Sequence, residues 1–88
     1  MLWENYLMSE RYKFLSFHGI DAVRHFWRTT QQQEIDYIEE RNGALYAFEF
    51  KWKTSSKLKM PKTFTQEYHP AASVLVTPET MDRFLINE

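Results

Sequence analysis

The dipeptide Asn42-Gly43 lies between two stretches of alternating polar and apolar residues, and it constrains the fold of this chain more than any other feature. These stretches are residues 34–40 (EIDYIEE) and 44–52 (ALYAFEFKW). A type I′ turn needs positive φ at both central positions, which Asn and Gly adopt at low cost. The sequence therefore predicts an antiparallel β-hairpin with Asn42 and Gly43 as its turn.

A two-residue turn determines which residues lie opposite each other in this hairpin. Counting back from the turn, Asp36 should lie opposite Glu49, and Glu34 opposite Lys51. Because side chains alternate between the faces of a sheet, these four charged residues should share one face. Directly opposed carboxylates repel each other, and either a bound divalent cation or the nearby Lys51 would offset that repulsion. The alternative is a solvated face with an ordinary Glu34–Lys51 ion pair and no binding site.

The remaining segments predict an α/β domain around the hairpin, in the order α-β-β-β-α-β-α, with a mixed sheet. We expect helices over residues 3–17, 61–68 and 78–85, and further strands over 24–29 and 72–77. The first helix carries a stripe of apolar residues at helical spacing, namely Trp3, Tyr6, Leu7, Phe14 and Phe17. If this stripe packs over the charged face of the hairpin, the carboxylates lie at the edge of a covered cleft.

The length of 88 residues predicts a single domain spanning residues 1–88. Aromatic residues make up 17% of the chain, so a small core can still bury a large area. There are no cysteines, which excludes disulfides and thiolate zinc sites. No apolar run approaches the roughly 20 residues that cross a bilayer, so we expect no membrane segment and a cytoplasmic location.

Charge is unevenly distributed along this chain, although its net value is only −1. Residues 51–62 (KWKTSSKLKMPK) contain five lysines and no acid. This segment is either a solvated loop or a loop that contacts phosphate groups, since lysines supply much of the sequence-independent affinity for nucleic acid. Trp27 and Trp52 are expected in the core rather than as platforms for base stacking.

Several blocks of the sequence resemble a known superfamily. They are LWEN at 2–5, FWRT at 26–29, EIDYI at 34–38 and FEFKW at 48–52. Together with the element order, they resemble the PD-(D/E)xK, or restriction-endonuclease-like, superfamily. Within it, the chain is similar to the C-terminal domain of unknown function of archaeal-type AAA+ ATPases, from Leu2 to about Thr77. Gln33 stands where that family often has Gly.

The resemblance implies an ATPase domain in full-length relatives. These 88 residues contain no GxxxxGK[ST] motif, so we expect the chain to be a fragment of a longer, ATPase-associated protein.

The resemblance also implies a magnesium-dependent nuclease site. Asp36, Glu49 and the carbonyl of Phe50 would hold the Mg²⁺ ion, and Lys51 would orient the attacking water or stabilise the transition state. Glu4 would assist from the first helix, although an acid in a first turn also stabilises the helix itself. The expected function is phosphodiester hydrolysis with nucleic acid as the partner.

Two other functions stay open from the sequence. The domain is either a catalytically inactive module that binds nucleic acid or protein, or a dimerising remnant of a truncated gene. A domain this small cannot easily bury all of its aromatic side chains. We therefore expect a homodimer, formed through Trp3 and Tyr6 or by pairing or exchange at the edge strand 24–29.

Overall fold

The computed structural model describes residues 2–86 of the chain. Its elements follow the predicted order and confirm the α/β fold class. They are α1 (Leu2–Phe17), β1 (Val23–Arg28), β2 (Glu34–Arg41), β3 (Ala44–Phe50), α2 (Lys62–Tyr68), β4 (Ala72–Val76) and α3 (Met81–Ile86).

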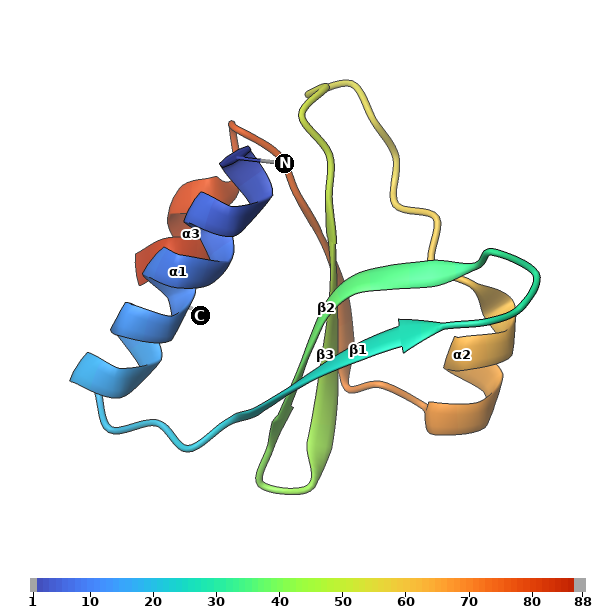
Figure 1. Ribbon diagram of the computed structural model, residues 1–88, viewed down its shortest axis with the longest axis horizontal. Coiled ribbons are helices and arrows are strands. Elements are labelled where there is room, and N and C mark those ends of the chain that lie inside the picture. Colours follow the sequence, from blue (N-terminus) through green and yellow to red (C-terminus); the bar gives the residue numbers. More distant parts are fainter. Residues whose placement is uncertain (1, 87–88) are drawn as a thin grey trace.

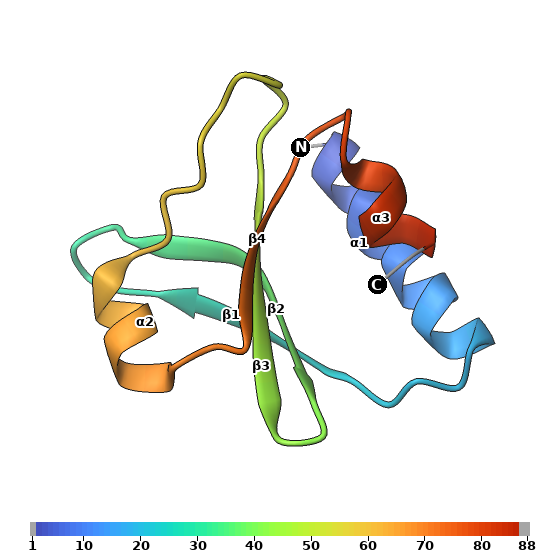
Figure 2. The same ribbon diagram turned by 180° about the vertical axis from the view of Figure 1, so that it is seen from behind.

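The four strands form one sheet in the order β1-β2-β3-β4. β2 is antiparallel to both β1 and β3, whereas β4 runs parallel to β3, with α2 in the crossover connection between them. Figure 1 and the reverse view in Figure 2 show α1 and α3 together on one side of the sheet, with α2 on the other. The domain is therefore a three-layer arrangement in which both sheet faces carry helices.

The hairpin has the predicted turn and register. Asn42 and Gly43 have φ of 52° and 81°, and Arg41 lies opposite Ala44. The pairing of β2 with β3 continues in this register to Tyr37, which lies opposite Phe48. The observed pairs of β2 with β3 end at Tyr37 and Phe48, so they do not include the predicted direct pair of Asp36 and Glu49.

The predicted pairing of Glu34 with Lys51 is wrong. Glu34 instead lies opposite Arg28 on β1, with 3.9 Å between Arg28 Nε and Glu34 Oε2. The register between β1 and β2 shifts between His25 and Trp27, before this pair is reached. At its first residues, β2 pairs with β1, and its register with β3 starts only at Tyr37.

Each sheet face has its own hydrophobic core. The face toward α1 and α3 buries Leu7, Tyr37, Phe48, Phe50, Val76 and Phe84. The face toward α2 buries Ile35, Ile38, Ala47 and Phe64. The first helix therefore does not cover the charged face of the hairpin, because α2 packs on that side and α1 packs on the aromatic side chains of β3.

The buried stripe of α1 differs from the predicted one. Leu7, Arg11 and Leu15, spaced four residues apart, are buried, whereas Tyr6 and Phe17 are exposed. The charged Arg11 occupies a buried position of α1, so a prediction from hydrophobicity alone assigns the buried stripe to the wrong side of the helix. The predicted end of the helix is confirmed, because Gly19 has φ of 65° and Ile20 N–H donates to the carbonyl of Leu15.

Two further expectations need correction. Trp52 is not in the core, because β3 ends at Phe50 and the ring of Trp52 lies 68% exposed in the loop that follows. The last helix begins at Met81 rather than at Pro78, because the N–H of Thr80 donates to the carbonyl of Thr77 and closes a turn first.

Candidate functional site

Asp36 and Glu49 come from neighbouring strands, β2 and β3. Glu49 lies between Phe48 and Phe50, which both pack toward α1 and α3, so its side chain is on the face that α2 covers. Asp36 lies where the register of β2 with β1 shifts, between Ile35 of the core near α2 and Tyr37 of the core near α1 and α3. The backbone N–H of Phe50 donates to Asp36 Oδ2 at 2.8 Å. The structure therefore brings the two predicted acids together at the start of β2 and the end of β3.

Lys51 and the following loop complete the surroundings of Glu49. Lys51 Nζ lies 3.7 Å from Glu49 Oε2, and the backbone N–H of Lys59 donates to Glu49 Oε1 at 3.1 Å. The N–H of Lys51 donates to the carbonyl of Val76 on β4, which anchors the backbone at this point. The lysine of the predicted motif thus lies beside its acid.

The electrostatics of Asp36 show that this carboxylate is not fully compensated. Burial raises its pKa, the hydrogen bond from Phe50 lowers it, and the charge of Glu49 raises it again. The resulting pKa lies above the ordinary value of 3.8. Asp36 and Glu49 are close enough to repel each other, as two ligands of one cation must be.

The donor set fits a magnesium ion held by two carboxylates. Mg²⁺ prefers oxygen ligands and keeps several waters, so one or two protein carboxylates and a substrate phosphate are enough to bind it. Within residues 2–86 no group of three or more acidic, histidine or cysteine side chains converges on one point. Phe50, the third predicted ligand, lies beside the pair, since its N–H already contacts Asp36.

Glu4 is the predicted site residue that the structure does not bring to this pair. It lies in the first turn of α1, whose Leu7 belongs to the core between the sheet and α1 and α3. The charges that act on Asp36 are those of Glu49, Lys51 and Glu34, none of which belongs to α1. The predicted assistance from the first helix has no support in this geometry.

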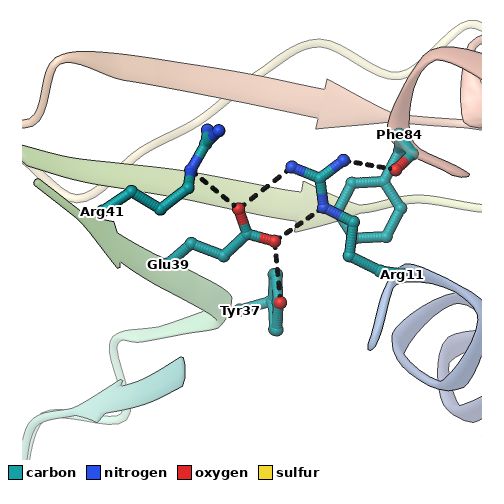
Figure 3. Close-up of polar contacts among 5 residues, drawn as sticks. All are labelled: Arg11, Tyr37, Glu39, Arg41 and Phe84. Carbon is teal, nitrogen blue, oxygen red and sulfur yellow. Dashed lines mark hydrogen bonds and ion pairs between the residues drawn. The ribbon is translucent and has the colours of Figure 1, made fainter. Parts of the chain in front are cut away.

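A second polar cluster, which the sequence did not predict, lies on the other face of the sheet (Figure 3). Arg11 donates to both oxygens of Glu39, with 2.7 Å from Nε to Oε2 and 3.0 Å from Nη2 to Oε1. Arg11 Nη1 donates to the carbonyl of Phe84 at 2.8 Å, and the Tyr37 hydroxyl donates to Glu39 Oε2 at 2.8 Å. Arg11 and Glu39 are both almost completely buried.

The pKa of Glu39 is shifted in the opposite direction from the pKa of Asp36. Burial alone would raise the pKa of Glu39, but the hydrogen bonds from Arg11 and Tyr37 and the charges of Arg11 and Arg41 outweigh it. The pKa therefore lies below its ordinary value, and the carboxylate stays ionised. Burial and the charge of Glu39 also raise the pKa of Tyr37, so its hydroxyl stays protonated and keeps donating. This cluster joins α1, β2 and α3.

One signal in the sequence could have revealed this cluster. In the strand 34–41, the alternation places Glu39 in the same phase as Tyr37, where a buried side chain is expected. Arg11 stands in the same phase as Leu7 and Leu15 of the helix. An acid and a base that both occupy core positions of their elements predict a buried ion pair.

A concave surface lies elsewhere on the α2 face, and neither Asp36 nor Glu49 lines it. It is a groove of about 620 Å³ between β1, the hairpin and α2, with His25, Trp27, Glu40, Leu45, Phe64 and Tyr68 among its lining residues. His25 Nε2 lies 2.9 Å from Glu40 Oε1 at its rim. The carboxylate pair therefore lies outside this groove and does not form part of its wall.

Fold and site together define the class of this protein as an α/β domain whose mixed sheet carries a carboxylate pair on a central hairpin. The family described as "Domain of unknown function (DUF4143)" matches residues 1–87. The chain therefore belongs to this uncharacterised family. No curated protein and no solved structure matches it. None of the helices in residues 2–86 has the length and apolar character that a membrane crossing requires.

Proposed function

We propose that this domain hydrolyses phosphodiester bonds of nucleic acid with a magnesium ion held by Asp36 and Glu49. The observation that carries the proposal is the convergence of these two carboxylates, with Lys51 beside Glu49 and the pKa of Asp36 raised by burial and by the charge of Glu49. An uncompensated carboxylate next to a second acid and a lysine is costly for folding, and such groups are typical of functional sites. The PD-(D/E)xK superfamily and the ATPase association stay predictions, supported by the four blocks of similarity.

Each residue of the proposed site has a separate role. The N–H groups of Phe50 and Lys59 orient the carboxylates of Asp36 and Glu49, so that both are preorganised as ligands. A bound magnesium ion supplies an acidic water and neutralises charge on the phosphate. Lys51 contributes a positive charge, which would bind a non-bridging phosphate oxygen and stabilise the charge that develops during the reaction.

The test compares nucleic-acid cleavage by the wild type, Asp36→Asn and Lys51→Met, with magnesium, manganese or EDTA. We expect metal-dependent cleavage by the wild type, none by Asp36→Asn, and a decrease of about 10²-fold for Lys51→Met. Glu67→Gln, which removes an exposed acid from α2, is the matched control and should cleave as the wild type does. Cleavage that is equal in all variants, or absent with both metals, contradicts the proposal.

A non-catalytic nucleic-acid-binding module is the second candidate. The five lysines of residues 51–62 favour it, because this segment contains no acid and all of its lysines are exposed. Binding of an oligonucleotide by the wild type without cleavage in either metal would select this candidate over the first.

We also infer a homodimer, as expected from the sequence. The support is an edge strand, β1, on which Phe26 is 61% exposed, together with Tyr6, which is 49% exposed on α1. Size exclusion with light scattering at high micromolar concentration measures the mass directly. A monomer mass at that concentration contradicts the inference.

A further inference from the structure

The loop between β3 and α2 carries a large aromatic ring into solvent. Trp52 is 68% exposed, although it contacts the ring of Trp3 edge to face, with 5.2 Å between the centroids and 84° between the planes. Burying a tryptophan is worth more than burying almost any other side chain. A tryptophan that is held by one ring contact and otherwise left in water is suited to bind a second flat group.

The same loop carries only positive charge. Lys51, Lys53, Lys57 and Lys59 lie in it, Lys62 opens α2, and all five are exposed. No acid occurs between residues 51 and 62. A polyanion is the partner that this charge distribution fits, because each phosphate that a lysine neutralises releases a counterion.

The loop is also joined to the proposed catalytic site at both of its ends. It begins at Lys51, next to Glu49, and returns to Glu49 through the N–H of Lys59. Figure 1 shows the loop rising beyond the end of β3 and coming back down to α2 on the side of the sheet that α2 covers. A chain that lies along this loop would thus pass the carboxylate pair.

We propose that residues 51–62 form a track for single-stranded nucleic acid, with Trp52 as the platform on which one base stacks. This rests on the proposed function, since it names the substrate class of the same site. Stacking on Trp52 needs a base whose face is open, which single strands offer and a duplex does not. Trp52 is adjacent in sequence to Lys51, so the stacking platform lies one residue from the lysine of the proposed site.

A membrane surface is the other partner that a tryptophan and lysines could fit, but the middle of the loop argues against it. Membrane-binding segments bury apolar side chains at the lipid boundary. Here Thr54 and Ser55 are exposed, and the N–H of Ser56 donates to the carbonyl of Lys53, which closes a polar turn. Leu58 is also exposed in this loop, at 39%, but the turn between Trp52 and Leu58 is polar. Its hydroxyl groups are suited to contact phosphate oxygens rather than to enter lipid.

The test measures binding of fluorescent dT20 by anisotropy in EDTA, where no metal-dependent cleavage occurs. Trp52→Ala should weaken binding by about tenfold, the cost of losing one stacked base, and Trp52→Phe should retain most of the affinity. Phe17→Ala, which removes a ring that is 86% exposed at the end of α1, is the matched control and should bind as the wild type does. An rU20 arm distinguishes RNA from DNA as the source of the strand.

The lysines have their own readout in the same assay. The double variant Lys53→Gln/Lys57→Gln should reduce the slope of log affinity against log salt by about 1.4, or roughly 0.7 for each phosphate that is no longer neutralised. Lys13→Gln on α1 removes one exposed lysine outside the loop and should leave the slope unchanged.

Three results would overturn the proposed track. They are tighter binding of a duplex than of dT20, equal binding by Trp52→Ala and the wild type, and Trp52-dependent binding to anionic vesicles without binding to either oligonucleotide. The proposed hydrolysis is tested separately from the track. Asp36→Asn should lose cleavage but should bind dT20 in EDTA at least as tightly as the wild type. Trp52-dependent binding without metal-dependent cleavage would keep the track and reject hydrolysis. If the wild type cleaves a duplex and Trp52→Ala cleaves it equally well, the proposed hydrolysis is kept and the track is rejected.

Discussion

Asp36 and Glu39 are carboxylates of the same strand, three positions apart, and they lie in opposite electrostatic surroundings. Glu39 is buried, accepts two hydrogen bonds from the planar guanidinium of Arg11, and accepts a third from Tyr37. Asp36 accepts one backbone N–H and lies within reach of a second acid.

These two carboxylates therefore have different roles. The protein itself supplies the positive charge and the hydrogen bonds that stabilise the ionised carboxylate of Glu39, and these lower its pKa. At Asp36, burial and the charge of Glu49 raise the pKa more than the Phe50 N–H and the charge of Lys51 lower it, and a bound cation would supply further positive charge. Glu39 is structural, and Asp36 is the one suited to a ligand.

The largest expected effect comes from removing the partner of Glu39. Arg11→Met leaves a buried carboxylate without its guanidinium, so we expect the free energy of unfolding to fall by about 3–5 kcal/mol. A domain of this size has little stability in reserve, so the variant should be largely unfolded at 37 °C. Urea denaturation followed by circular dichroism measures the decrease.

Two matched variants sharpen this prediction. Lys13→Gln breaks an exposed ion pair with Glu10 on the same helix, and it should cost less than about 1 kcal/mol. The double variant Arg11→Met/Glu39→Met removes both buried charges and should recover most of the stability. A double variant as unstable as Arg11→Met would show that Arg11 acts through its contact with Phe84 rather than through Glu39.

The next largest effect concerns acid pH. Because the folded state lowers the pKa of Glu39, its stabilisation is fully present above the ordinary value of 4.5 and is lost as pH falls through the lowered value. Glu39→Gln should therefore cost about 1.5–3 kcal/mol at pH 7 and progressively less toward pH 3. Unfolding curves of both proteins between pH 3 and 7 give the difference, and a constant difference contradicts the interpretation.

A smaller effect is expected from metal at the other carboxylate. Manganese at about ten times its Kd should stabilise the wild type by about 1.4 kcal/mol, which raises the Tm of a domain this size by roughly 6–10 °C. Asp36→Asn should abolish the shift, and Glu39→Gln should keep it. A manganese titration that leaves the Tm of the wild type unchanged counts against the metal site.

The smallest effect is the relief of repulsion at Asp36 without metal. The folded state raises the pKa of Asp36, so ionisation of this group costs stability as pH rises above the ordinary value of 3.8. Asp36→Asn keeps an oxygen for the Phe50 N–H and removes the charge, so it should stabilise the protein in EDTA at pH 7 by about 0.2–1 kcal/mol. Destabilisation would mean that the negative charge is needed by the fold.

Local patterns predicted much of this protein. Element order, the Asn42-Gly43 turn, the pairing of Arg41 with Ala44 and the end of α1 near Gly19 all follow from periodicity and turn chemistry, which act over a few residues. The sequence also predicted that Asp36 and Lys51 lie near Glu49, as they do. Strand pairing alone does not account for this, because the pairs of β2 with β3 end at Tyr37 and β3 ends at Phe50.

Only the tertiary structure decided the rest. It placed α1 on the aromatic face, paired Glu34 with Arg28, left Trp52 in solvent and joined Arg11 to Glu39, 28 residues away along the chain. Each of these depends on which apolar surfaces pack together across elements. Hydrophobic burial is non-directional, so local periodicity identifies a buried side chain but not the surface that buries it.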